Sequence, residues 1–222
     1  MASVISPDGI EMRIFFKPEV KISAIDLNQG AALIAGLGNP TAKYRSNRHN
    51  AGFMVVEQLA ERLGVRFSRV ESKSLVTRAD YNGRRLILAK PQTFMNLSGQ
   101  AVSQLARFYK VPIQDILIAY DDVDLPLGTL RLRPGGGAAG QKGMLSVIEQ
   151  LGTQDIPRLR VGIGAPPGRM DAADYVLQDF SNAEKEIITI TLKQAVDAIL
   201  VFAIEGIVSA MNRFNSQGHD ES

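Results

Sequence analysis

Residues 31–53, AALIAGLGNPTAKYRSNRHNAGF, decide the fold of this chain. The apolar run at 31–35 predicts a buried strand, and a turn rich in Gly and Asn follows it. Apolar residues at helical spacing begin near Asn50, so the stretch predicts strand, loop and helix in that order. His49 lies at the end of the loop, while the other histidine, His219, lies near the C-terminus. His49 is therefore the candidate for acid–base chemistry near pH 7.

The rest of the chain alternates short apolar runs with helical periods. The turn pair Asn82-Gly83 predicts a hairpin, and Ser98 is expected to cap a helix over 99–109, with Phe108 facing inward. Strands are expected at 75–80, 85–90, 116–120, 130–133 and 159–163, and further helices at 140–151, 172–177 and 183–206. The pattern predicts an α/β fold with a central mixed β-sheet flanked by helices.

The expected domain boundaries follow from the same pattern. A single globular domain is expected over 31–213. Residues 1–30, with weakly strand-like runs at 13–16 and 20–22, form an N-terminal extension of unknown role. Residues 214–222 form a C-terminal tail in which disorder is expected.

Composition excludes several classes of chemistry. The 222 residues include no cysteine, which rules out disulfides, thiolate nucleophiles and Cys-ligated zinc. The first thirty residues have no basic region followed by an apolar core, and no uninterrupted apolar stretch approaches a membrane span. The net charge of +2 is too small to indicate a nucleic-acid partner by itself. We expect a soluble cytoplasmic protein without a membrane segment.

Two polar loops follow predicted strands. In GLGNP (36–40) the glycines suggest phosphate binding, but Thr41 stands where a dinucleotide fold needs its third glycine. Asn39 either projects its amide from this loop or caps a turn. In KPQTFMNLSG (90–99), Phe94 and Met95 are either core plugs or an exposed platform for a ligand. Asn96 either holds a carbonyl or a water or caps the next helix.

Two further loops carry charge. Asp121, Asp122 and Asp124 follow a buried strand, and one of them is expected to hydrogen-bond the His49 imidazole. A metal site is not expected, because no second carboxylate cluster accompanies them. The Gly-rich loop at 135–143 opens a helix and carries Lys142, which favours an anion. Since Ser98 lies in no nucleophile elbow, water activated by a histidine is the hydrolytic mechanism that fits best.

The basic residues of the C-terminal half have few acids between them. They form either a site for a phosphate-rich partner or an ordinary solvated surface. They are Arg131, Arg133, Lys142, Arg158, Arg160 and Arg169.

These loops, in this order, resemble the bacterial-type peptidyl-tRNA hydrolase family over residues 31–213. The motifs that carry the resemblance are GLGNP…Y…NRHNAGF (36–53), KPQTFMNLSG (90–99), YDDVDLPLG (120–128), the Gly-rich loop and PRLRVGIG (157–164). The resemblance implies a monomeric, cofactor-free hydrolase of translation. Such an enzyme cleaves the ester between a peptide and the 3′ end of tRNA and so recycles the tRNA.

The resemblance also implies roles for individual residues. His49 corresponds to the general base, and Asp121 supports it. Asn39 corresponds to the residue that distinguishes blocked from free aminoacyl-tRNA. Residues implied to contact the substrate near the 3′ end are Tyr44, Phe94, Met95, Asn96, Gln141 and Lys142. Residues implied to hold acceptor-stem phosphates are Arg131, Arg133 and Arg160.

Two departures from the family pattern keep an alternative open. Gln141-Lys142 stands where the family usually has His-Asn, and Tyr120 replaces a common histidine. The alternative is a non-catalytic RNA-binding relative of the same fold, like the organellar intron-splicing factors that resemble this family. The His49–Asp121 pair favours the enzyme, because binding alone needs no general base.

Overall fold

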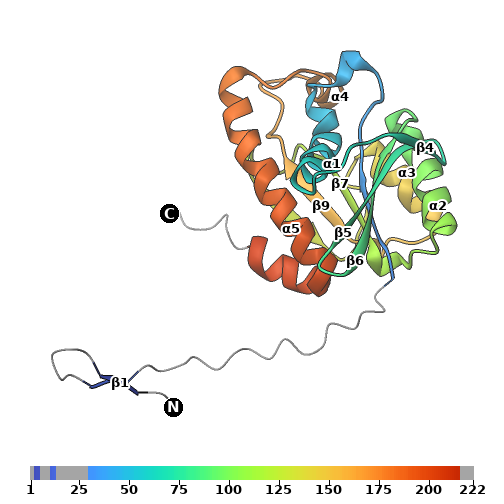
Figure 1. Cartoon of the computed structure of the whole chain (residues 1–222). Coiled ribbons are helices and arrows are strands. Elements are labelled where there is room, and N and C mark those ends of the chain that lie inside the picture. The colour runs from blue at the N-terminus through green and yellow to red at the C-terminus, as the bar shows by residue number, and fades with distance from the viewer. Residues whose placement is uncertain (1–2, 6–10, 14–29, 216–222) are drawn as a thin grey trace.

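A seven-stranded mixed sheet forms the centre of the molecule (Figure 1). The computed structural model describes residues 3–5, 11–13 and 30–215. The strands lie in the order β4-β5-β6-β3-β7-β9-β8. Strands β6, β3, β7 and β9 are parallel to one another, and β4, β5 and β8 are antiparallel to their neighbours. Their bounds are β3 Ala32–Gly36, β4 Arg69–Glu71, β5 Ser74–Tyr81, β6 Arg84–Pro91, β7 Ile116–Asp122, β8 Leu130–Arg133 and β9 Arg158–Gly162. The expected mixed α/β sheet is confirmed.

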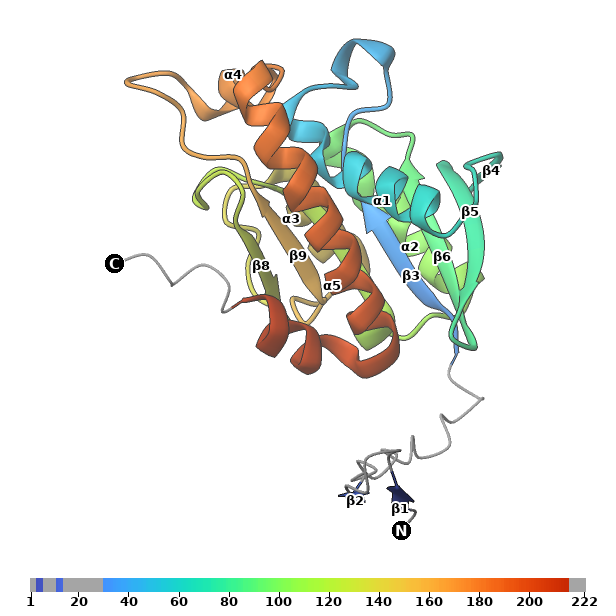
Figure 2. The ribbon, with the colours of Figure 1, turned by 60° about the vertical axis from the view of Figure 1, so that its left-hand side comes forward.

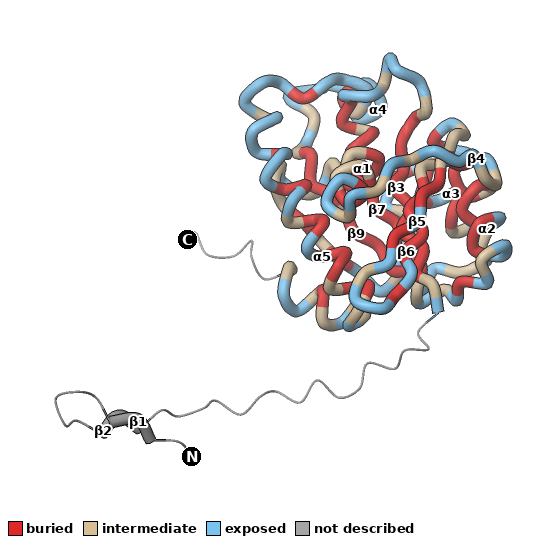
Figure 3. Tube along the Cα trace, in the orientation of Figure 1, coloured by how far each residue is buried: buried red, intermediate tan, exposed pale blue. Residues whose placement is uncertain are grey.

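Helices cover both faces of this sheet (Figure 2). Helices α1 (Ala51–Arg62) and α5 (Asn182–Phe214) lie on one face, and α2 (Ser98–Phe108) and α3 (Lys142–Leu151) on the other. Side chains of β3 alternate between the two layers: Ala32 and Ile34 pack toward α1 and α5, Leu33 and Ala35 toward α2 and α3. Burial on both sides explains why these strands are continuously apolar. Figure 3 shows the buried strands between helices with exposed outer faces.

Glycines bring α1 unusually close to the sheet. A Cβ atom on Gly36 would lie 2.1 Å from the carbonyl oxygen of Gly52, and one on Gly52 would lie 2.2 Å from that of Ala119. Any larger residue at either position would overlap backbone atoms. The contact fixes the first turn of α1 on β3 and β7, and with it the short helix η2 (Arg48–Asn50) that carries His49.

The expected hairpin is present, whereas two expectations for α2 are wrong. Asn82 and Gly83 both have positive φ and join β5 to β6. Ser98 does not cap α2: it is the helix's first residue, directly after the 3-10 turn η3 (Met95–Leu97), and its buried hydroxyl has no hydrogen-bond partner among the described residues. Phe108 is 67% exposed rather than inward-facing, and its ring packs edge-on against Tyr109 in the last turn.

Helix α5 extends beyond the expected end at residue 206. Gly206 has a φ of 83° and marks a kink, after which the helix continues to Phe214. Asn215 then pairs with both backbone groups of Leu132 on the edge strand β8, at 2.8 and 3.0 Å. By length and composition α5 would suffice to cross a membrane, but 56% of its most apolar window is buried in the protein. Its buried side chains pack on the sheet, so α5 is a core helix.

The remaining elements lie around this three-layer body. They are the 3-10 turns η1 (Ala42–Tyr44) and η4 (Ile113–Asp115) and the short helix α4 (Ala172–Val176). Near the N-terminus, β1 (Ser3–Ile5) pairs antiparallel with β2 (Glu11–Arg13). The strand-like runs expected at 14–16 and 20–22, and residues 216–222 of the expected tail, lie outside the described residues.

Candidate active site

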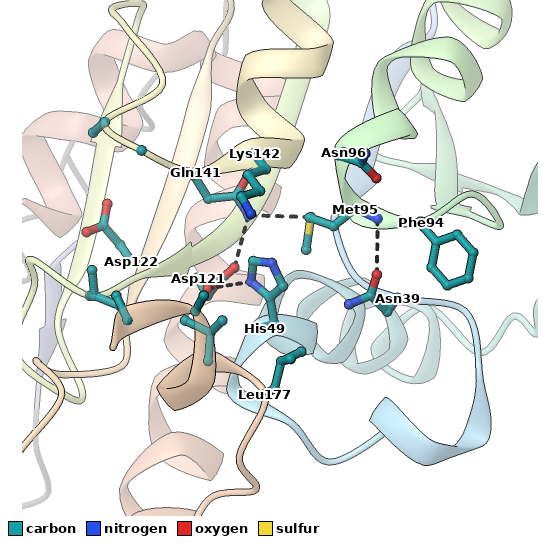
Figure 4. A pocket seen from close by; sticks show the side chains of 16 residues that line it. Asn39, His49, Phe94, Met95, Asn96, Asp121, Asp122, Gln141, Lys142 and Leu177 are labelled. Carbon is teal, nitrogen blue, oxygen red and sulfur yellow. Dashed lines mark hydrogen bonds and ion pairs between the residues drawn. The ribbon is translucent and has the colours of Figure 1, made fainter. Parts of the chain in front are cut away.

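The loops predicted to carry chemistry meet at one edge of the sheet. Strands β3, β6 and β7 are parallel, so their carboxyl ends lie together, where open α/β sheets usually bind ligands. A cavity of about 560 Å³ opens there (Figure 4). Its walls come from the loops after these three strands, from the N-terminus of α3 and from α4.

His49 and Asp121 form a hydrogen-bonded pair at the wall of this cavity. His49 Nδ1 lies 2.8 Å from Oδ2 of Asp121, which is 3% exposed at the end of β7. An ionised carboxylate only accepts hydrogen bonds, so the neutral imidazole carries its proton on Nδ1 and leaves Nε2 with a lone pair. Within the described part of the chain Nε2 has no hydrogen-bond partner. The imidazole is therefore arranged to accept a proton at the cavity.

Two asparagines close the loop that carries His49. The Asn39 N–H donates to Asn50 Oδ1 at 2.8 Å, and Asn50 Nδ2 donates to the Asn39 carbonyl at 3.0 Å. Asn39 Oδ1 also accepts from the Met95 N–H at 3.0 Å, which joins the first loop to the second. Among the described residues its Nδ2 has no partner, and Asn39 lines the cavity. Sequence reasoning overlooked Asn50, although it directly follows His49 in a polar cluster.

Phe94 and Met95 were expected to be either buried in the core or exposed, and the structure shows one of each. Phe94 is 59% exposed on the cavity wall, and Met95 is buried beside it. Asn96 is exposed at the cavity and caps no helix. Lys142 stands exposed at the rim, whereas Gln141 is buried (Figure 4). Tyr44 lies on η1, half-buried and outside the cavity lining.

The carboxylates at the carboxyl end of β7 bind different partners. Asp121 binds His49, while Asp122 forms an ion pair with Arg160 and accepts from the Asp124 N–H at 2.9 Å. Among residues 30–215 no group of three His, Asp or Glu side chains is arranged to hold a metal ion. Tyr120, the residue before Asp121 in β7, is buried in the core, and burial raises the pKa of its hydroxyl.

Comparison with known proteins assigns the family. A sequence model described as peptidyl-tRNA hydrolase matches residues 33–222 of this chain. The chain belongs to the peptidyl-tRNA hydrolase family. This confirms the resemblance carried by the loop motifs.

Individual relatives cover nearly the whole domain. Peptidyl-tRNA hydrolase from Chloroflexus aggregans is 50% identical over 184 residues, which are 82% of this chain and 98% of that protein. The chloroplastic peptidyl-tRNA hydrolase of Arabidopsis thaliana is 46% identical over 186 residues, covering 83% of this chain and 65% of the relative. The crystal structure of peptidyl-tRNA hydrolase from Acinetobacter baumannii superimposes with a TM-score of 0.78 and 34% identity, covering 84% of this chain and 95% of that one.

In this member of the peptidyl-tRNA hydrolase family, the basic residues of the C-terminal half have different environments. Arg133 is exposed on the edge strand β8, and Arg131 is half-buried with Nη1 3.4 Å from the Asn215 carbonyl. Arg160 lies directly across from Arg131 and pairs with Asp122. Arg158 is buried and donates to three backbone carbonyls, including that of Gly137 in the Gly-rich loop. Arg158 therefore anchors that loop and is not part of a basic surface.

Arg48 is a further residue that sequence reasoning missed. Its Nη2 lies 2.8 Å from Glu184 Oε2, and its Nη1 donates to the Asp179 carbonyl at 2.7 Å. The guanidinium also lies 4.4 Å from the centre of the Tyr175 ring. These contacts bind the start of α5 and the end of α4 to η2, one residue before His49. Only the tertiary fold brings Glu184 to Arg48, so the sequence held no local signal for the pair.

Proposed function

We propose that this chain hydrolyses the ester bond that joins a peptide to the 3′ end of tRNA. The observation that carries the proposal is the His49 Nδ1–Asp121 Oδ2 hydrogen bond at the wall of a cavity, with no described residue bonded to Nε2. Family membership supports the same activity, because the relatives bear the name peptidyl-tRNA hydrolase. A protein that only bound RNA would have no use for a buried carboxylate that orients a base.

His49 takes the role of general base. Nε2 removes a proton from a water molecule as the water oxygen bonds to the ester carbonyl carbon. The carbon–oxygen bond to the tRNA then breaks, and the 3′ oxygen leaves with the proton held by the imidazolium. Asp121 stabilises the positive charge that develops on the ring. The reaction balances with water alone, so no cofactor is proposed.

Side chains around His49 place the ester. Asn39 Nδ2 supplies a donor to a carbonyl of the peptide, because its Oδ1 is already held by Met95. Lys142 and Asn96 supply further donors at the rim, where negative charge on the carbonyl oxygen can be stabilised. The exposed ring of Phe94 gives a stacking surface for a base at the 3′ end. Tyr44 stands outside the cavity, where it can meet the tRNA rather than the ester.

Arg131, Arg133 and Arg160 form the proposed contact with acceptor-stem phosphates. Strand β8 is antiparallel to β9, so its residues lie progressively farther from the carboxyl edge of the sheet. A phosphate chain bound there runs along β8, away from the cavity at the carboxyl edge. Arg133 is the most available of the three, since it is exposed and has no ion pair within the described residues. We expect the enzyme to work as a monomer in the cytoplasm.

The wild-type chain provides the test of this function. We expect it to release tRNA from N-acetyl-aminoacyl-tRNA and to leave the free aminoacyl-tRNA largely intact, as measured by acid precipitation of the labelled acyl group. Binding of the blocked substrate without release, even at enzyme concentrations above that of the substrate, would instead support the non-catalytic RNA-binding alternative.

A further inference from the structure

Gln141 joins the N-terminus of α3 to the catalytic pair. It is the N-cap residue of α3 and is only 9% exposed, although neighbouring Lys142 is exposed. Its Oε1 accepts from the Met144 N–H at 2.7 Å. A glutamine is an uncommon helix cap, because shorter side chains reach the first-turn N–H groups more easily. The length of this side chain therefore serves something besides the cap.

The other end of the amide meets Asp121. Gln141 Nε2 donates to Asp121 Oδ1 at 3.1 Å and lies 3.5 Å from the sulfur of Met95. The orientation of the amide is fixed by its partners, because the Met144 N–H requires an acceptor and the carboxylate requires a donor. Reversing the amide would lose both hydrogen bonds. Both polar atoms of the Gln141 amide are thus engaged within the protein, and the substrate contact that the resemblance implies for Gln141 stays a prediction.

Asp121 is consequently held on both oxygens. Oδ1 accepts from Gln141 and Oδ2 from His49, and the carboxylate is almost wholly buried. No other side chain of the described residues donates to it. Without Gln141, the buried Oδ1 would lose its hydrogen-bond donor. The carboxylate could then rotate to accept a hydrogen bond from another group.

We propose that Gln141 is a positioning residue that fixes the Asp121 carboxylate, so that Oδ2 faces His49 Nδ1 and keeps the proton on that nitrogen. The inference rests on the proposed function for its kinetic consequence, but the positioning itself is a property of the resting protein. Gln141 also couples the base to the Gly-rich loop, whose Gly137 carbonyl is held by Arg158.

A Gln141→Ser variant separates the two bonds of this residue. Serine is a preferred helix cap, so it retains a partner for the first turn of α3, but it is too short to reach Asp121. We expect kcat to fall on the order of 10- to 100-fold with KM nearly unchanged, since the loss is one of orientation. Val147→Ala is the matched control: it removes buried volume from α3 without touching either bond, so the melting temperature falls and kcat stays.

The protonation of the His49 ring gives a readout independent of turnover. The chain has two histidines, so a His219→Ala background leaves one imidazole in a 15N-histidine NMR spectrum. At about pH 8.5, where an ordinary imidazole is neutral, we expect His49 to be protonated on Nδ1. In Gln141→Ser we expect a mixture with the Nε2-protonated tautomer, and in Val147→Ala no change.

The outcomes distinguish this inference from the proposed function. An unchanged tautomer in Gln141→Ser overturns the inference whatever happens to kcat, because positioning through Asp121 would then be absent. A shifted tautomer together with a fall in kcat supports it. A shifted tautomer in a chain that hydrolyses no blocked aminoacyl-tRNA supports the positioning and refutes the proposed function.

Discussion

At the residue scale, one tertiary contact decides between three adjacent carboxylates. The sequence limited the partner of His49 to Asp121, Asp122 or Asp124, and the family resemblance assigned Asp121. The structure agrees, since Asp122 is paired with Arg160 and Asp121 with His49. Successive side chains of a strand point to opposite faces, so neighbours at the end of β7 meet different partners. That alternation was predictable, but the position of Arg160 was not.

Asn39→Asp separates the two roles of Asn39. Aspartate keeps an oxygen to accept from the Met95 N–H but removes the donor that faces the cavity. We expect kcat/KM for N-acetyl-aminoacyl-tRNA to fall on the order of 10²-fold, the cost of a lost donor to a reacting carbonyl. The melting temperature should stay within a degree or two. A large thermal destabilisation with intact kcat/KM would show that Asn39 serves only the loop.

Arg133→Ala tests the phosphate contact. Each neutralised phosphate contributes a slope of about 0.7 to 0.9 to the dependence of log affinity on log salt concentration. We expect the variant to bind tRNA more weakly. The magnitude of that slope should fall by about 0.7 to 0.9, the contribution of one phosphate contact. Arg62→Ala is the control, because Arg62 is exposed on α1, which covers the other face of the sheet. An equal slope in both variants would remove Arg133 from the proposed contact.

At the element scale, periodicity predicted most helices and strands and was wrong where a neighbouring element intervened. The strand–loop–helix order of residues 31–62 and the Asn82-Gly83 hairpin follow from local signals. Ser98 has the residue type of a helix cap, but a preceding 3-10 turn places it inside the helix. Gly206 has the residue type of a helix end, yet the chain resumes its helix because its final turns pack against β8.

Gly52→Ala tests whether close approach of α1 to the sheet is required. A Cβ there would lie 2.2 Å from the Ala119 carbonyl oxygen, so α1 must move away from β7. We expect a loss of about 1–3 kcal/mol or more in the free energy of unfolding, measured by urea denaturation, since overpacking a rigid contact costs this much. Activity should also fall, because η2 and His49 move with α1.

Gly30→Ala is the control for this substitution. Among the described residues nothing lies within 4 Å of a Cβ at Gly30, so its effect on stability should be small. Equal stability of Gly52→Ala and Gly30→Ala would contradict the packing that places η2.

At the scale of the whole molecule, the sequence predicted a single α/β domain with a central mixed sheet flanked by helices, but not the order of the strands in that sheet. The order depends on pairings between residues far apart in the chain, such as β3 with β7, which local patterns do not encode. The link between η2 and the start of α5 through Arg48 and Glu184 is of the same kind. This ion pair holds the start of α5 against η2, the segment that carries His49.

Stability at low pH tests this link. Burial alone would raise the pKa of Glu184, but hydrogen bonds from Ser181 and the Arg48 guanidinium bring it below its usual value near 4.5. A carboxylate with a lowered pKa stabilises the fold above about pH 4.5, and this contribution is lost as the pH falls through the folded-state pKa. We therefore expect Glu184→Gln to lower the free energy of unfolding at pH 7, with the difference from wild type shrinking below about pH 4.

Glu149→Gln is the matched control for the acid series. Glu149 is exposed on α3 and has no ion pair among the described residues. Its free energy of unfolding, measured in urea titrations, should stay near that of the wild type both at pH 7 and below about pH 4. A Glu184→Gln difference that does not change with pH would show that the carboxylate's charge contributes nothing to the link.

Hydrolysis of N-acetyl-aminoacyl-tRNA by His49→Ala, measured in single turnovers with enzyme in excess, bears most directly on the His49–Asp121 pair. We predict a rate lower by about 10²–10⁴-fold, the usual contribution of a general base. The dissociation constant for tRNA should be nearly unchanged, since the proposed phosphate contacts lie on β8 and β9. His219→Ala, the control at the other histidine, should keep the wild-type rate. A His49→Ala rate within a factor of about two of wild type would contradict the role of His49 as the base.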